Sequence, residues 1–225
     1  MSPLTVESPP ERPPVRRRTN GRVPPPTPPT GGGDDDRNGS WGRPLDNVRL
    51  AMMFLIAGEV MFFAALVSGF FVLRLAAPLW PPPLQPRLPV FVTGLNTLVL
   101  LGSSVAMLGA TRAVGRGERS RALRRLALTA ALGTLFLAVQ GYEWTRLIEY
   151  GLTTSSGAYG GTFYTLIGAH AAHVLGALIW LAVTLTLAAR GRFLDGRTAV
   201  LRACAIYWHF VVALWPVLYV TVYLI

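Results

Sequence analysis

The chain has 225 residues, of which 52% are hydrophobic and only 14% are charged, and its mean hydropathy is +0.42. This composition excludes a water-soluble globular protein, which needs charged residues spread over its surface. The net charge of +10 comes from arginines in the tail and between apolar stretches, not from a basic helical face with interleaved aromatic residues. The charge therefore does not indicate nucleic-acid binding, and we expect an integral membrane protein with a polar tail.

The first 47 residues are rich in proline and glycine. A proline-rich run over residues 24–29 is followed by three glycines and three aspartates over residues 31–36. Such a composition buries too little apolar surface to offset the entropy lost on folding. We predict a disordered tail over residues 1–47 and one membrane domain over residues 48–225.

Five apolar segments follow the tail, at residues 50–73, 90–111, 126–145, 159–189 and 203–225. Each is close to or above the roughly 20 residues that a helix needs to cross a hydrocarbon core of about 30 Å. The sequence therefore predicts an all-α fold, a bundle of five transmembrane helices.

The arginines next to these segments predict the orientation of the bundle. Three lie on one side, at positions 74, 87 and 146, and thirteen on the other, at positions 37, 43, 49, 112, 116, 119, 121, 124, 125, 190, 192, 197 and 202. Arginine is enriched in cytoplasmic loops. We expect the N-terminus and its tail in the cytoplasm and the C-terminus outside.

Glu59 lies about ten residues into the first segment, which places it near the middle of the bilayer at 1.5 Å per residue. An unpaired carboxylate is unfavourable there, so Glu59 should face protein and be protonated or paired. Two interpretations stay open: a proton-linked or gating carboxylate, and a neutral acid that joins two helices by a hydrogen bond.

Three histidines occupy the last two segments. His170 and His173 are three residues apart and share a helix face, and His209 lies on the final segment. By depth, Glu59, His173 and His209 can occupy one layer, which allows a buried Glu–His contact. A bis-histidine haem site or a metal site that includes Glu59 is the alternative, but paired Glu-x-x-His motifs of the di-iron type are missing. We expect structural, hydrogen-bonding histidines and no metal or cofactor bound by this chain.

Glu143 is predicted near the outer membrane interface, one helical turn before Arg146. The i, i+3 spacing suits an ion pair that anchors the end of the third helix. The sequence contains no phosphate-binding loop, nucleophile elbow, zinc-protease motif or Cys-x-x-Cys motif. With no catalytic residues indicated, the chain is typical of one subunit of a larger complex.

Five stretches resemble, in the same order, motifs of cytochrome c oxidase subunit III. They are GEVMFF at 58–63, QGYEW at 140–144, SGAYGGTFY at 156–164, GAHAAHVLG at 168–176 and YWHFV at 207–211. The resemblance covers residues 48–225 and excludes the tail. Val212 departs from it, since many members have aspartate there, so a role that needs a second buried carboxylate is not carried over.

The resemblance implies a non-catalytic subunit of an aerobic haem–copper terminal oxidase in the bacterial inner membrane. Such a subunit packs against subunit I, in a complex that also contains subunit II, supports oxygen reduction and proton uptake, and can hold phospholipid. Haem and copper would lie in the partner subunits. Glu59 matches the buried carboxylate of the family, and His170, His173 and His209 match its helix-packing histidines.

Many members of this family have seven helices, whereas five are predicted here. The sequence leaves other functions open: a similar subunit of a quinol oxidase or nitric oxide reductase, a stand-alone haem-binding membrane anchor that uses His173 and His209, and a small transporter with Glu59 as proton carrier.

Overall fold

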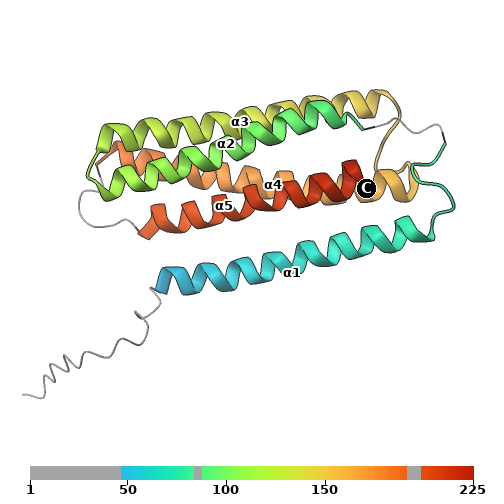
Figure 1. Ribbon diagram of the computed structural model, residues 1–225, viewed down its shortest axis with the longest axis horizontal. Coiled ribbons are helices and arrows are strands. Elements are labelled where there is room, and N and C mark those ends of the chain that lie inside the picture. The colour runs from blue at the N-terminus through green and yellow to red at the C-terminus, as the bar shows by residue number, and fades with distance from the viewer. Residues whose placement is uncertain (1–46, 84–87, 192–198) are drawn as a thin grey trace, which may run out of the picture. The chain divides into compact units, whose positions relative to one another are not determined.

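The computed structural model describes residues 47–83, 88–191 and 199–225. Within these ranges the chain forms five α-helices and a short π-helix, and no strand (Figure 1). They are α1 (Asn47–Ala76), α2 (Val90–Gly115), α3 (Arg119–Glu149), α4 (Gly157–Ala189), α5 (Ala199–Tyr219) and η1 (Val220–Leu224). Each α-helix, α5 together with η1, is long and apolar enough to cross a membrane, which confirms the predicted fold class. The predicted tail lies almost entirely outside the described residues.

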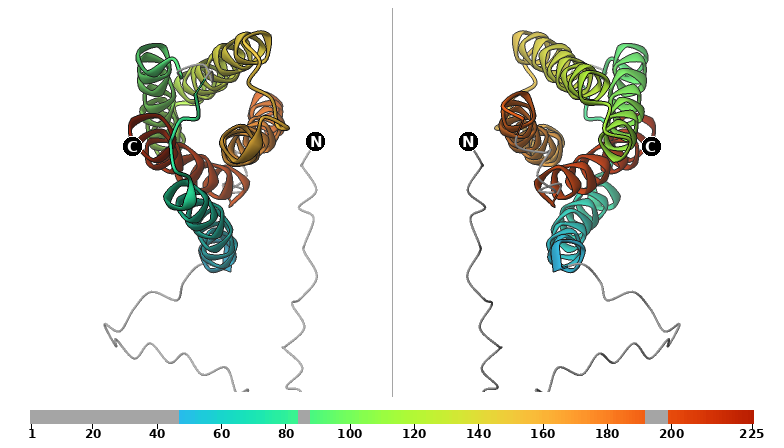
Figure 2. Two further views of the ribbon diagram at one scale, coloured as in Figure 1. Left: turned by 90° about the vertical axis from the view of Figure 1, so that its right-hand side faces the viewer. Right: turned by 90° about the vertical axis from the view of Figure 1, so that its left-hand side faces the viewer.

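Helices α2, α3, α4 and α5 form a closed ring in which each helix packs against its two neighbours, as the end-on views in Figure 2 show. Helix α1 lies outside this ring and contacts α4 and α5. Only three of its residues are buried: Met52, Phe63 and Phe70. Most of its other apolar side chains, such as Met61 and Leu75, are exposed, as expected for a helix that faces lipid or another protein.

The helices run alternately up and down, so their connections gather at two ends (Figure 1). The start of α1, the α2–α3 turn and the end of α4 lie at one end, which we call the arginine-rich end. The end of α1, the start of α2, the end of α3 and Ile225 lie at the other, which we call the C-terminal end. Among the arginines that the structure describes, Arg74 and Arg146 lie at the C-terminal end and the others at the arginine-rich end, as the sequence predicts. Which end faces the cytoplasm stays a prediction.

Local sequence explains where the helices end. Helix α1 stops at Ala76, two residues before Pro78, since proline restricts the residue before it and cannot donate a backbone hydrogen bond. Helix α2 ends at a turn in which Gly117 has a φ of +73°, a conformation that glycine adopts without steric cost. Pro216 lies inside α5, and the chain continues as a helix beyond it before widening into η1.

The interior of the ring is filled by aromatic side chains. Phe136 of α3 packs edge-on against Trp215 of α5 at 5.0 Å between ring centroids. Trp208, also on α5, is 1% exposed and donates a hydrogen bond from Nε1 to the Ser103 hydroxyl of α2 at 3.2 Å. Its ring lies against Gly133 of α3, where an added Cβ would come within 2.4 Å of Cη2. The absence of a side chain at Gly133 therefore lets α5 approach α3.

Candidate functional site

The predicted Glu–His contact is present and joins α1 to α4. Glu59 Oε2 lies 2.9 Å from His173 Nε2, and the two side chains are 19% and 22% exposed. The rings of Phe62 and Phe63 flank His173 at centroid distances of 5.9 and 5.1 Å. An aromatic surrounding with little water strengthens the electrostatic interaction between the two polar groups.

The second ring nitrogen of His173 limits the possible protonation states of this pair. Nδ1 lies 2.6 Å from the carbonyl oxygen of Ala169, which can only accept a hydrogen bond, so Nδ1 carries a proton. Nε2 then either donates to a Glu59 carboxylate as part of an imidazolium or accepts from a protonated Glu59. In both arrangements one proton lies between the Glu59 carboxyl group and His173 Nε2.

His209 does not join this pair. Its Nδ1 lies 2.6 Å from the Ser104 hydroxyl of α2, so the side chain bonds across the α2–α5 contact. His173, by contrast, faces α1 across the α1–α4 contact. The two histidines therefore serve different helix pairs.

His170 lies in the aromatic interior of the ring and is 1% exposed. It stacks on Trp215 with 5.0 Å between centroids and has edge contacts with Phe63 and Phe136. Neither ring nitrogen has a hydrogen-bond partner among the described residues. His170 therefore contacts the interior through ring stacking, and the hydrogen bond expected from the sequence is not found among the described residues.

The predicted ion pair between Glu143 and Arg146 is wrong. Within the described residues Glu143 has no basic partner: its Oε2 accepts hydrogen bonds from the Thr93 hydroxyl at 2.8 Å and from Gln140 Nε2 at 3.3 Å. Arg146 donates instead to the hydroxyl groups of Tyr142 at 3.4 Å and Tyr150 at 2.7 Å. Glu143 thus bonds to a buried hydroxyl group of α2, and Arg146 bonds to the tyrosines one turn before and one turn after it. These contacts replace the ion pair that the i, i+3 spacing predicts.

Residues 43–225 match the family model described as cytochrome c oxidase subunit III. A protein of Synechocystis sp. named cytochrome c oxidase subunit 3 is 33% identical over 189 residues, covering 84% of this chain and 79% of the relative. The Corynebacterium diphtheriae protein of that name is 34% identical, covering 84% and 93%. The Cyprinus carpio protein is 37% identical, covering 78% and 69%.

The chain belongs to the cytochrome c oxidase subunit III family.

The matched region begins just before α1, so the subunit III domain coincides with the five helices. The bacterial relative from Corynebacterium is covered almost completely, whereas nearly a third of the carp protein has no counterpart in the alignment. The matched region of this chain therefore contains five helices, and the alignment leaves part of the longer relatives without a counterpart.

Within the parts of the chain that the structure describes, no three histidine, cysteine, aspartate or glutamate residues of this subunit III gather in one place. A bis-histidine haem site would need His173 and His209 on facing helices, but they point to different helix contacts, and Nδ1 of each and Nε2 of His173 have other partners. The geometry does not fit the haem-anchor alternative.

The ionisable groups in the sequence did not predict several other polar contacts in the interior of this subunit III. Gln140 donates to Glu143 and to the Tyr223 hydroxyl at 3.2 Å, Asn96 donates to the carbonyl oxygen of Phe136 at 3.0 Å, and Trp215 donates to the Thr97 hydroxyl at 2.8 Å. The amide side chains inside otherwise apolar spans could have indicated these contacts, because an amide group in a membrane helix needs hydrogen-bond partners.

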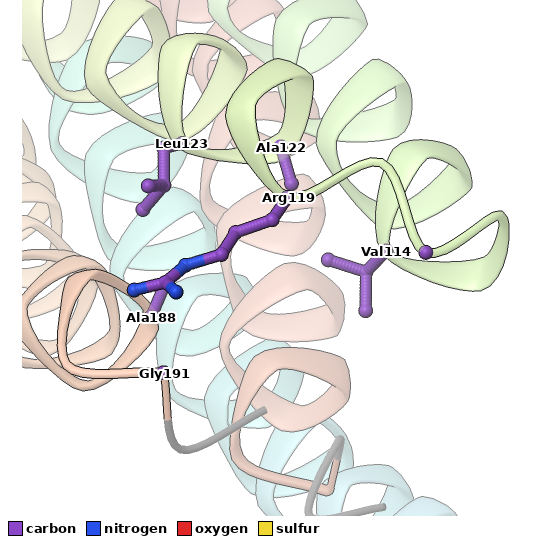
Figure 3. Close-up of a pocket in the computed structure, with 7 residues that line it drawn as sticks. Val114, Arg119, Ala122, Leu123, Ala188 and Gly191 are labelled. Carbon is purple, nitrogen blue, oxygen red and sulfur yellow. The ribbon is translucent and has the colours of Figure 1, made fainter. Parts of the chain in front are cut away.

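At the arginine-rich end, Arg119 connects two helices of subunit III. Figure 3 shows its side chain extending from the start of α3 towards Ala188 and Gly191 at the end of α4. Nη2 donates a hydrogen bond to the carbonyl oxygen of Ala189 at 2.6 Å. A cation at a helix C-terminus satisfies carbonyl groups that have no partner within the helix and interacts favourably with the helix dipole. This hydrogen bond of Arg119 therefore connects the start of α3 to the end of α4.

Proposed function

We propose that this subunit III works in an aerobic terminal oxidase that transfers electrons from cytochrome c to oxygen, in contact with subunit I and in a complex with subunit II. The family match over residues 43–225 carries this proposal. Haem and copper belong to the partner subunits, and this chain supplies no catalytic centre. The large apolar side chains exposed on α1 offer area for lipid and for helices of partner subunits.

The Glu59–His173 pair is the group of this chain best suited to a role in proton uptake. It holds one proton in a partly exposed position on the α1–α4 contact. The role is tested by the Glu59→Gln variant of the assembled oxidase. We expect full assembly and haem content, with slower turnover or earlier inactivation during turnover. An unchanged rate and lifetime would assign the pair to helix packing alone.

We place the chain in the bacterial inner membrane with its N-terminus in the cytoplasm, on the basis of the arginine distribution. The only cysteine of the sequence, Cys204, is buried, so we expect it to react little with a thiol reagent and not to obscure the labelling of an introduced cysteine. A membrane-impermeant maleimide applied to intact spheroplasts should label Leu79→Cys and spare Arg116→Cys. The reverse pattern would invert the topology.

The function is tested by purifying the oxidase through a tag on this chain in mild detergent. We expect a haem- and copper-containing core to copurify and to consume oxygen with reduced cytochrome c. Consumption with quinol alone would make the complex a quinol oxidase, and nitric oxide reduction would assign it to that class. A lone coloured chain would support the haem anchor, and proton-coupled uptake by the lone chain in liposomes would support the transporter.

A further inference from the structure

A network of hydrogen bonds leads to the buried carboxyl group of Glu143 at the C-terminal end of the bundle. Glu143 Oε2 lies 2.8 Å from the Thr93 hydroxyl of α2 and 3.3 Å from Gln140 Nε2. The Tyr223 hydroxyl of η1 has a hydrogen bond with Thr93 and accepts another from Gln140 at 3.2 Å. Side chains from α2, α3 and η1 are therefore joined in one network that includes an acid and two hydroxyl groups.

Glu143 has no cation beside it to balance a negative charge. Among the described residues it makes no ion pair, and it is 5% exposed. Arg146, one turn along α3, donates to two tyrosines of its own helix. The other titratable groups near the network are the phenols of Tyr223 and of Tyr159 on α4, which bring no positive charge. An uncompensated carboxylate in such a position is unfavourable, and gaining a proton removes the charge.

Thr93 can bond to Glu143 in either protonation state. Its hydroxyl oxygen lies close to two oxygen atoms, Glu143 Oε2 and the carbonyl oxygen of Pro89 at 3.0 Å, but the hydroxyl carries only one hydrogen. Next to a carboxylate, this hydrogen points to Glu143. When Glu143 carries a proton, that proton occupies the 2.8 Å contact and the Thr93 hydrogen turns to Pro89. Glu143 can therefore gain or lose a proton without losing its bond to α2.

The network lies close to the end of the bundle. Thr93 is the fourth residue of α2, and Glu143 is six residues before the end of α3, about 9 Å along the helix axis. A pocket of about 310 Å³ is lined by Tyr223, Tyr159 and Arg74. Water in this pocket does not have to reach the carboxyl oxygens, because hydroxyl groups can pass a proton over the remaining distance. The phenol oxygen of Tyr223 accepts one hydrogen bond from an amide of α3, which leaves a second lone pair for water.

We propose that Glu143 is a second proton-holding site of this chain, separate from the Glu59–His173 pair, and that Tyr223 and Thr93 connect it to the C-terminal end of the bundle. A proton from water in the pocket binds to the Tyr223 hydroxyl, the phenol proton moves to Thr93, and the Thr93 proton moves to Glu143 Oε2. One proton enters and Glu143 gains one, and release follows the same steps in reverse. Use of this site by the oxidase rests on the proposed function, whereas the holding of the proton does not.

The test is infrared spectroscopy of the purified full-length chain in lipid nanodiscs at neutral pH. A protonated carboxyl group has its own C=O stretching band, which shifts to lower frequency when deuterium replaces the proton. Glu143→Gln should remove one such band, whereas Glu149→Gln, at an exposed position at the end of α3, should remove none. An unchanged band in Glu143→Gln would overturn the proposal. Because no partner subunit is needed, that result would leave the proposed oxidase role standing.

Exchange into D2O tests the route. Tyr223→Phe should slow the shift of the Glu143 band by at least about tenfold, because exchange must then wait for local opening of the bundle. Tyr219→Phe is the matched control, since the Tyr219 hydroxyl bonds to the carbonyl oxygen of Val90. Equal exchange rates in Tyr223→Phe and the unaltered chain would overturn the route. If Tyr223→Phe does not fold, Thr93→Ser should keep the fast exchange and Thr93→Val should lose it, and equal rates in these two variants would also overturn the route.

Discussion

The close approach of α5 to α3 makes Gly133→Ala the sharpest test of the packing. The new Cβ would lie 2.4 Å from Cη2 and 2.9 Å from Cζ2 of Trp208, and 3.0 Å from a methyl group of Leu178. Favourable carbon–carbon contacts are about 3.5–4.0 Å, so the indole would have to move by more than about 1 Å. Trp208 is fully buried, and such a shift would also strain its hydrogen bond to Ser103.

The magnitude follows from three effects. Overpacking a filled core costs about 1–3 kcal/mol, and loss of the Trp208–Ser103 hydrogen bond costs about 1 kcal/mol. Replacing glycine by alanine inside a helix stabilises the helix by about 0.5–1 kcal/mol, which offsets part of this loss. We expect a net loss of about 2 kcal/mol in the free energy of unfolding, which corresponds to a Tm lower by about 4–8 °C for a chain of this size.

The assay is thermal unfolding of the purified full-length chain in mild detergent, followed by tryptophan fluorescence and circular dichroism. Gly141→Ala is the matched control on α3, since an added Cβ there meets nothing within 4 Å. Trp208→Phe removes the two clashing ring atoms, so the double variant should lose less than the sum of the single variants. A Gly133→Ala chain as stable as the wild type, or strictly additive losses, would refute the reasoning.

Variants at three further residues test individual contacts in the same unfolding assay. Glu59→Ala should lower the free energy of unfolding by about 1–3 kcal/mol because it leaves His173 without its partner, and Glu59→Gln should lower it less; equal stability of all three chains would contradict the contact. Thr97→Val should cost about 1–2 kcal/mol because the Trp215 indole N–H loses its acceptor, whereas Thr97→Ser, which keeps the hydroxyl, should cost less; equal losses would contradict a specific contribution of the hydroxyl group. Arg119→Gln should cost less than about 1 kcal/mol, since the bond to α4 lies in an exposed position, and a loss as large as that of Thr97→Val would show a wider role for this arginine.

The sequence was sufficient to predict the five helices, because the spans are long, apolar and separated by arginines or prolines. Depth along a helix was also sufficient to suggest the Glu59–His173 contact, which the structure confirms. The depth of a residue in the membrane does not tell in which direction its side chain points around the helix axis. Depth therefore could not show that His209 bonds to Ser104 and does not contact Glu59.

The incorrect Glu143–Arg146 ion pair shows what spacing within one helix leaves out. The i, i+3 rule compares two side chains on an isolated helix, whereas Glu143 turns towards a hydroxyl group on α2 that no local pattern specifies. The tyrosines at i−4 and i+4 of Arg146 were visible in the sequence and could have been recognised as competing acceptors.

The position of α1 outside the ring bears on how the chain is inserted into the membrane. Helix α1 is made first, yet its contacts are with α4 and α5, which are made last. The α2–α3 hairpin can close as soon as its short turn has emerged, because its contacts are local in sequence. Until α4 is made, Glu59 lacks the His173 partner that it has in the folded chain. Because the ring closes only when α5 packs against α2 and α4, α1 can complete its contacts with α4 and α5 only after the last helix has been made.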